Sequence, residues 1–218
     1  APLAESGALL DSTGPASVYR PPRPIPVPAD GDPHRATVAV IDLDAVLDHL
    51  TVPKITPEVY LRATVTNTSP HTLLPGRASI FHGQDFVGTT ELELLPPGAE
   101  IELHLGVDNR MRVERELVRR STGRRVVGNA RRTDVAYQIT VGNHSPLRTK
   151  VTVRDQVPVS RHDSIVIRDV TADPAPAEQT DLGLLTWKIE LEPGESRRLG
   201  FSFRMESPRG AEVTGLGD

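Results

Sequence analysis

Cysteine is absent from this chain of 218 residues, so disulfide bonds, thiol catalysis and thiolate metal sites are excluded. Aromatic residues make up only 4% of the sequence, which leaves few large side chains to fill a core. No apolar run approaches the roughly 18 residues of a membrane-spanning helix. Residues 1–15 lack a basic start followed by an apolar stretch, so they do not resemble a signal peptide. These absences do not decide the compartment, for which the cytoplasm is our working expectation.

Lysine is almost missing as well, with three lysines against 22 arginines. We interpret this bias as that of a GC-rich bacterial genome. The net charge of -4 indicates a soluble protein and selects no class of partner. The chain opens without methionine, and we therefore expect a fragment of a longer protein.

Proline is concentrated at the start of the chain, where residues 1–35 hold eight of the twenty prolines. Proline at every second residue from Pro22 to Pro28 fixes φ and removes backbone donors, which favours an extended polyproline conformation. We predict a disordered linker over residues 1–35. A ligand for a proline-binding domain is the alternative interpretation.

Two stretches of the sequence share one skeleton. Tyr60–Pro70 reads YLRATVTNTSP and Tyr137–Pro146 reads YQITVGNHSP, so tyrosine, Thr-Val, asparagine and Ser-Pro recur in the same order. Each copy is followed by a strand, a Pro-Gly turn and a second strand, at residues 92–106 and 188–203. This internal repeat predicts two tandem β units.

Alternation of apolar and polar residues dominates both units and predicts half-buried strands. About six strands per hundred residues, joined by turns and without a convincing helix, are typical of an antiparallel β-sandwich. We predict an all-β protein of two tandem immunoglobulin- or fibronectin-like sandwiches. Their ranges are a linker at 1–35, a first unit at 36–109, a second unit at 110–208 and a tail at 209–218. The first unit is less regular, so a distorted sandwich or partial barrel stays open there.

Three hairpins are expected from turn chemistry. One turns at His82–Asp85. The next places Leu92 and Leu94 inward, because a slip by one residue would bury the neighbouring glutamates. The last hairpin contains the only tryptophan, Trp187, and two of the four phenylalanines, so it should supply most of the second core.

Arginine is concentrated in residues 110–132, which hold nine arginines against two glutamates and carry a local charge of +7. A long twisted hairpin fits this segment best, and a helix is the alternative. The arginines either pair with the acidic remainder of the chain or form a docking surface for an anionic partner. Aromatic residues for stacking on single strands are absent, so nucleic acid is the weakest choice of partner. The candidates for binding an anion or partner are Arg115, Arg119, Arg120, Arg124 and Arg125.

Three polar residues are candidates for structural roles in turns or interfaces. Asp108 ends a strand where the arginine segment begins, so we expect a turn-capping or arginine-paired carboxylate that holds the two units together. Asn67 and Asn143 are the corner residues of the repeat. Both also begin formal glycosylation sequons, although backbone hydrogen bonding is the preferred interpretation.

No constellation of catalytic residues rises above chance. The seven histidines are scattered without the spacing of a zinc site, and no ligand loop for calcium follows Asp42–Asp48. Ser160–Ser164 contains triad residue types without a nucleophile elbow, and there is no phosphate-binding loop. We therefore predict no catalytic residue, metal or cofactor. The alternative is a hydrolase-like site between the units near Asp108, His82 and Asp85.

The residues also resemble a known family. The landmarks are Leu74–Gly76, Phe86–Gly88, Leu105–Asp108, TVGNHSP, Leu185–Trp187 and Ser207–Pro208. Together they resemble the C-terminal domain of mucoidy-inhibitor-A-like proteins, a domain of unknown function, over about residues 36–208. Members of that family carry an N-terminal domain and a coiled coil before this module, which this sequence lacks. The resemblance implies an influence on exopolysaccharide production and no established activity.

The sequence therefore favours a non-enzymatic interaction or scaffold module. It would bind a protein or a polyanionic partner through its loops and the arginine-rich hairpin. A purely structural spacer is a further alternative, and the sequence does not determine the oligomeric state.

Overall fold

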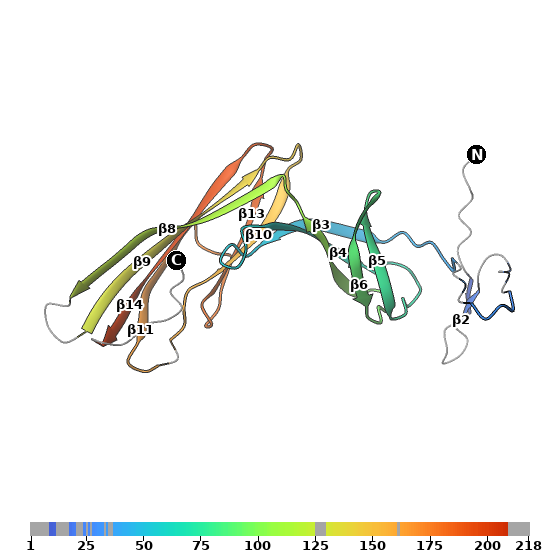
Figure 1. Cartoon of the computed structure of the whole chain (residues 1–218), viewed down its shortest axis with the longest axis horizontal. Coiled ribbons are helices and arrows are strands. Elements are labelled where there is room, and N and C mark those ends of the chain that lie inside the picture. The colour runs from blue at the N-terminus through green and yellow to red at the C-terminus, as the bar shows by residue number, and fades with distance from the viewer. Residues whose placement is uncertain are drawn as a thin grey trace. The chain divides into compact units, whose positions relative to one another are not determined.

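The structure is a computed structural model that describes residues 9–11, 18–20, 24, 26, 28–32, 34, 37–124, 130–160 and 162–208. Every regular element in these ranges is a β-strand (Figure 1). The prediction of an all-β protein is thereby confirmed. None of the described residues forms a helix that could cross a membrane.

The strands assemble into sheets of different sizes (Figure 1). A six-stranded sheet has the order β12-β13-β10-β3-β4-β7, a four-stranded sheet has the order β11-β14-β9-β8, and β5 pairs only with β6. The strand bounds are β1 Leu9–Asp11, β2 Val18–Arg20, β3 Asp44–Thr51, β4 Val59–Thr66, β5 Gly76–His82, β6 Asp85–Leu92, β7 Glu100–Val107, β8 Met111–Arg124, β9 Ala130–Asn143, β10 Thr149–Gln156, β11 Val166–Asp173, β12 Glu178–Gln179, β13 Leu184–Leu191 and β14 Ser196–Pro208.

The N-terminal part of the chain differs from the prediction in two places. The strands β1 and β2 pair with each other inside the segment predicted as a disordered linker, most of whose other residues lie outside the described ones. The alternation beginning at Ala36 also produces no strand before Asp44. Val40 is exposed there, because no sheet face covers it.

The chain divides into two compact units. The first comprises Ala1–Val46 and Ala63–Leu103, and the second comprises Leu47–Arg62 and His104–Asp218. Strands β3, β4 and β7 contribute residues to both units. Each unit is described separately below.

The second unit contains the hydrophobic core. Alternate residues of β9 and β14 point inward from the four-stranded sheet, as the sequence pattern requires. They meet inward residues of β10 and β13, so two sheets share one dry interior. The buried set includes Val135, Tyr137, Ile139, Val141, Val151, Val153, Leu185, Trp187, Ile189, Leu191, Leu199, Phe201 and Phe203. Trp187 donates its indole N–H to the carbonyl of Pro174 at 2.8 Å, so the largest core residue has no unsatisfied polar atom.

The repeated corner has the same hydrogen bonds in both units. The Nδ2 of Asn67 donates to the carbonyls of His71 and Leu95, and the backbone N–H of Ser69 donates to Asn67 Oδ1. In the second unit Asn143 Nδ2 donates to the carbonyls of Leu147 and Leu191, and the N–H of Ser145 donates to Asn143 Oδ1. The recurrence in sequence is therefore a recurrence in backbone geometry.

The first unit lacks a comparable core, and the residues paired between β5 and β6 explain why. The bridge Leu73–Leu95 continues into the β5–β6 pairs, and the pair Thr149–Leu191 continues into the β10–β13 pairs in the same register. Where the second unit pairs buried Val153 with buried Trp187, the first pairs Arg77 with Glu91, and both are exposed. The hairpin that should cover the core thus presents charge at the equivalent positions.

The hairpins follow the predicted turns, with one error. The pair His82–Asp85 closes a two-residue loop in which Gly83 has φ 64°, a conformation that glycine adopts without strain. Leu92 is half-buried as predicted. Leu94, also expected inward, is 55% exposed, because β6 ends at Leu92 and the alternation no longer follows a sheet face.

Candidate functional site

The outer face of the four-stranded sheet is built from the residues that alternate with the core. Arg132, Asp134, Ala136, Gln138 and Thr140 of β9 are all half-buried. Partial burial of a polar row on an outer sheet face means that neighbouring side chains cover one another. The sheet therefore carries a structured polar surface on the side away from its core.

One row of paired residues crosses all four strands at the same level, and its members on the two central strands are small. Arg119 on β8 lies opposite Ala136 on β9, Ala136 lies opposite Ser202 on β14, and Ser202 lies opposite Thr171 on β11. The hydroxyls of Thr171 and Ser202 are 2.8 Å apart. Because the middle of the row has short side chains, it forms the floor of a trough of about 310 Å³.

Both edge strands are bulged beside this row. On β8 the pairing shifts between Leu117 and Arg119, and Val118 is the extra residue. On β11 the pairing shifts between Arg168 and Thr171, and Asp169 has φ 52° there. Bulges re-aim side chains and recur next to functional sites, and a left-handed non-glycine residue is costly unless its surroundings hold it. Both irregularities thus border the same trough.

A charge network forms one wall of the trough. Arg204 donates from Nε to Asp134 Oδ1 at 2.8 Å and from Nη1 to Asp169, and Arg132 Nε lies 3.2 Å from Asp134 Oδ2. The hydrogen bond from Arg204, followed by that from Arg132, lowers the pKa of Asp134 below its ordinary value. Asp134 is thereby held as a carboxylate paired with arginine, and Asp169 pairs with Arg204.

Arg119 is the arginine of this trough that has no acidic partner among the described residues. The trough is lined by three arginines and two aspartates, and both aspartates bind Arg204 or Arg132. Among the residues that the structure describes, no hydrogen bond or ion pair of Arg119 is found. Its exposed guanidinium lines the same trough as the hydroxyls of Ser202 and Thr171 and can donate to an external anion.

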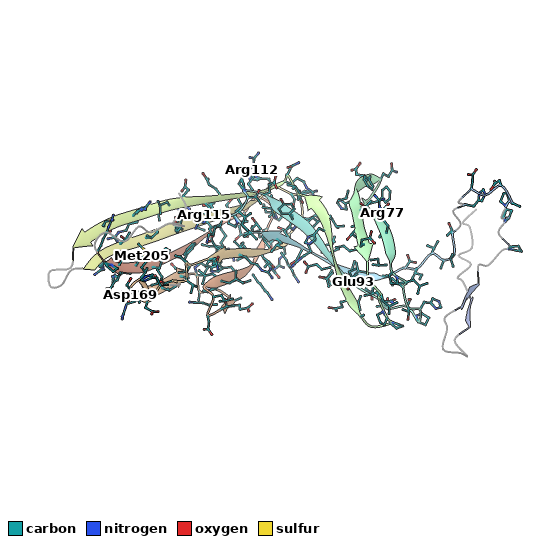
Figure 2. All side chains as sticks on the ribbon, turned by 60° about the horizontal axis from the view of Figure 1, so that its bottom comes forward. Arg77, Glu93, Arg112, Arg115, Asp169 and Met205 are labelled. Carbon is teal, nitrogen blue, oxygen red and sulfur yellow. The ribbon has the colours of Figure 1, made fainter. Side chains whose placement is uncertain are left out.

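Arg115 has a different position from the other predicted candidates. Arg115, labelled in Figure 2, stacks on the ring of Tyr137 with Cζ 3.7 Å from the centroid and donates from Nε to Asp155 Oδ2 at 2.8 Å. Its side chain is 12% exposed and that of Asp155 is fully buried. Arg115 is therefore occupied by an internal contact.

The remaining arginine candidates do not gather on one surface. Arg119 belongs to the outer row, whereas Arg120 lies opposite the inward residue Val135 and so belongs to the other face of β8. The side chain of Arg124 and all of Arg125 lie outside the described residues. Of the five arginines, the structure thus assigns Arg119 to the trough.

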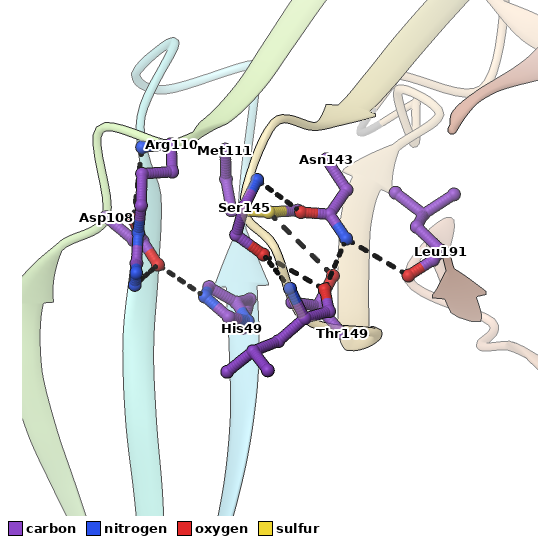
Figure 3. Close-up of polar contacts among 9 residues, drawn as sticks. His49, Asp108, Arg110, Met111, Asn143, Ser145, Thr149 and Leu191 are labelled. Carbon is purple, nitrogen blue, oxygen red and sulfur yellow. Dashed lines mark hydrogen bonds and ion pairs between the residues drawn. The ribbon is translucent and has the colours of Figure 1, made fainter. Parts of the chain in front are cut away.

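Asp108 lies at the turn where β8 begins (Figure 3). Its carboxylate accepts hydrogen bonds from the Nε, Nη2 and backbone N–H of Arg110 at 2.8–3.0 Å, and Nε2 of the buried His49 is 3.1 Å away. The guanidinium of Arg110, followed by His49, holds the pKa of Asp108 well below its usual range. All three residues belong to the second unit.

We expect the substitution Asp108→Asn to destabilise the fold near neutral pH. It removes charge-assisted hydrogen bonds worth roughly 1.5–3 kcal/mol each before compensation, and we expect a net loss of about 2 kcal/mol. Since the folded pKa is lowered, the stabilisation is complete above the unfolded pKa of about 4 and is lost as the pH falls further. Urea unfolding at several pH values should show the variant and the parent converging below about pH 4. A constant difference down to the acid limb would contradict the ion-pair role.

An open cleft of about 730 Å³ borders Asp108 and also contains Glu58, Arg112, Glu114 and His144. A general acid or base works best with a pKa near the working pH. The pKa of Asp108 is lowered, which takes it further from a neutral working pH. Its carboxylate oxygens are also occupied by the hydrogen bonds described above. His82 and Asp85, the other residues of the hydrolase alternative, face each other across the exposed β5–β6 turn of the first unit.

The two sequons have side chains that are already in use. Asn67 and Asn143 are both fully buried, and each Nδ2 donates to backbone carbonyls as described above. An amide in such a position is not accessible for glycan attachment in the folded chain. Across the described part of the chain, no group of three histidine or acidic residues is arranged to hold a metal ion.

No sequence motif marks the trough. Ala136, Thr171 and Ser202 carry no motif, and Asp134 and Asp169 are far from Arg204 along the chain, with separations of 70 and 35 residues. The usable signals are weak, namely an arginine inside an alternating strand and a break in that alternation at Leu117–Val118.

The fold and the site define the class: an all-β protein of two compact units, the second carrying a polar trough with an arginine. The chain belongs to the family described as a domain of unknown function (DUF4139), which matches residues 8–209. It is similar to Protein F37C4.5 of Caenorhabditis elegans, with 28% identity over 222 residues that cover 95% of this chain and 40% of the relative. The chain thus spans well under half of that relative. No solved structure matches.

Proposed function

We propose that this chain is a non-enzymatic interaction module that binds an anionic partner through the arginine-bearing sheet of its second unit. The observation that carries the proposal is Arg119, an exposed guanidinium without a carboxylate partner among the described residues, set in a trough whose other arginines are neutralised. An arginine with hydroxyl neighbours recognises carboxylate or phosphate oxygens.

The lining of the trough favours a carboxylated sugar as the bound group. Thr171 and Ser202 offer hydroxyls, Asp134 and Asp169 offer acceptor oxygens, and Arg119 offers donors. A hydroxyl-rich ring with a carboxylate matches this mixture of donors and acceptors. The resemblance to mucoidy-inhibitor-A-like proteins, which implies a link to exopolysaccharide, supports the same choice.

The finer description of the fold belongs to this proposal. We interpret each unit as an immunoglobulin- or fibronectin-like sandwich and the chain as their tandem pair. The shared corner geometry at Asn67 and Asn143 supports this interpretation, as does the pairing of two sheets around the core of the second unit.

Removal of Arg119 tests the proposal. We expect Arg119→Ser to weaken binding of an oligouronate at least about 10-fold, since one charge-assisted hydrogen bond contributes roughly 1.5–3 kcal/mol. Titration calorimetry at low and high salt should show affinity falling with salt in the parent. Oligoglutamate as a second probe distinguishes a sugar acid from an acidic peptide.

The matched control is Arg154→Ser, which removes an exposed arginine from β10 in the other sheet of the same unit. It should leave the affinity for either probe unchanged. Absence of binding by the parent to both probes would refute the proposal, as would equal losses in the two variants.

A further inference from the structure

The β5–β6 hairpin of the first unit has an open edge that differs from every other edge in the described residues. Neither strand pairs with a third one. In the second unit β10, the register counterpart of β5, has its outer edge covered by β3 in parallel pairing, at Val151–His49 through Val153–Thr51. Strands β10 and β13 thus lie inside a six-stranded sheet, whereas β5 and β6 form a sheet of two strands.

Natural proteins protect free strand edges with charges, bulges, proline or short length. The longer edges have such protection: β8 exposes Arg112, Glu114 and Glu116, and β7 exposes Glu100 and Glu102. Other edges are protected by bulges or by short length. Strand β11 is bulged, β6 is bulged at Val87, and β12 has only two residues.

The middle of the β5 edge has none of these features. Residues 78–81 read Ala-Ser-Ile-Phe and contain no charge and no proline, and the extra residue of the β5–β6 bulge lies on β6. Arg77, labelled in Figure 2, is the single arginine of this strand, which contains no lysine, aspartate or glutamate. An uncharged, regular edge of this kind pairs readily with another strand.

Exposed aromatic rings lie beside this edge. Phe81 and Phe86 are 58% and 60% exposed, and their rings meet edge to face with centroids 5.5 Å apart. The bulge at Val87 turns Phe86 to the same face as Phe81, because the two residues are paired directly. The other two phenylalanines, Phe201 and Phe203, are buried in the core. Half of the phenylalanines thus lie on the surface of one short hairpin, which is typical of an interaction site.

We propose that this edge pairs with the same edge of a second copy of the chain, antiparallel and centred on Ser79. Two-fold pairing at Ser79 places Ala78 opposite Ile80 of the second copy and Arg77 opposite its Phe81. No like charges then oppose each other, and the guanidinium meets an aromatic ring. The product is a four-stranded sheet in which each β5 edge is covered, as β3 covers the edge of β10 in the second unit.

The dimer should be weak. A single strand pair of this length buries much less than the roughly 1,200–2,000 Å² of a standard stable interface. Sedimentation velocity on the full chain from about 1 µM to about 1 mM, a range that spans weak association, should therefore show a concentration-dependent monomer–dimer equilibrium.

A charged residue at position 79 tests whether the two-fold axis of the dimer passes through Ser79. Ser79→Lys and Ser79→Glu each place two like charges face to face, so each variant alone should dissociate at least about 10-fold more readily. An equimolar mixture of the two should dimerise again, because Lys then faces Glu. The matched control is Thr89→Lys, which adds the same charge directly across the hairpin on β6, at a residue equally exposed.

The control variant should dimerise like the parent. A parent that stays monomeric at every concentration overturns the inference and leaves the edge to a strand of another protein. Equal loss in the Thr89→Lys and Ser79→Lys variants also overturns it, as does failure of the mixture to recover the dimer. Arg119 plays no part in this contact, so the outcome is independent of anion binding.

Discussion

Replacement of Arg115 by methionine should lower the free energy of unfolding by about 3–5 kcal/mol, the cost of removing one partner of a buried ion pair. The carboxylate of Asp155 has no exposed surface, and Arg115 is the side chain that neutralises it. Methionine preserves much of the packing volume over Tyr137 but leaves the charge uncompensated. Urea unfolding followed by tryptophan fluorescence measures the effect, since Trp187 lies in the same core.

Two further variants isolate the charge from the packing. Arg115→Met combined with Asp155→Leu should recover most of the loss, because two apolar residues can replace a buried pair. Recovery stays incomplete, since Asp155 Oδ1 also accepts the N–H of Gln156. As a control, Arg148→Met removes an exposed arginine paired with Glu190 and should cost less than about 1 kcal/mol. Similar losses for Arg115→Met and Arg148→Met would show that burial of the pair is unimportant.

Replacement of Asn143 by alanine should cost about 3 kcal/mol, because several buried backbone groups lose their partner at once. The side chain of Asn143 donates to the carbonyl of Leu191 and accepts the N–H of Ser145 (Figure 3). It also donates to the carbonyls of Leu147 and Glu192. Alanine offers none of these bonds and leaves a cavity too confined to replace them. Chemical denaturation gives the total loss, and hydrogen exchange at Ser145 should report the local opening.

The repeat supplies an internal comparison for this prediction. Asn67→Ala removes the equivalent bonds in the first unit and should destabilise that unit by a similar amount. Its hydrogen exchange should accelerate at Ser69 while Ser145 stays protected. His144→Ala changes the exposed neighbour of Asn143 and should cost less than about 0.5 kcal/mol. An Asn143→Ala variant as stable as the His144→Ala variant would show that the corner is not held by this amide.

Local sequence patterns predicted much of the fold because their causes are local. Alternation at Val135–Val141 requires a strand with one dry face, and glycine at position 83 permits the tight turn of the β5–β6 hairpin. The recurrence of Asn67 at Asn143 reflects in part a local pattern, in which the asparagine bonds to backbone groups two and four residues later. Its bonds to Leu95 and Leu191 are long-range. Leu94 shows the limit of this reasoning, since alternation alone does not say where a strand ends.

The candidate site could be predicted only in part. Arginine enrichment pointed to β8, but nothing local separates Arg115, which faces the core, from Arg119, which faces the trough. The bulge at Val118 changes which face the following residues occupy. That bulge depends on how β8 pairs with β9 across the whole hairpin.

By itself, the sequence determined an all-β chain with a repeated corner and arginines concentrated on one pair of strands, because these features arise from neighbours along the chain. The tertiary structure alone decided that Asp155 neutralises Arg115, that Asp134 and Asp169 neutralise Arg204, and that Arg119 is left exposed in the same trough as Ser202. Such partners lie on different strands, separated by 35–70 residues. Sheet order and register bring them together, and neither is encoded in any single segment.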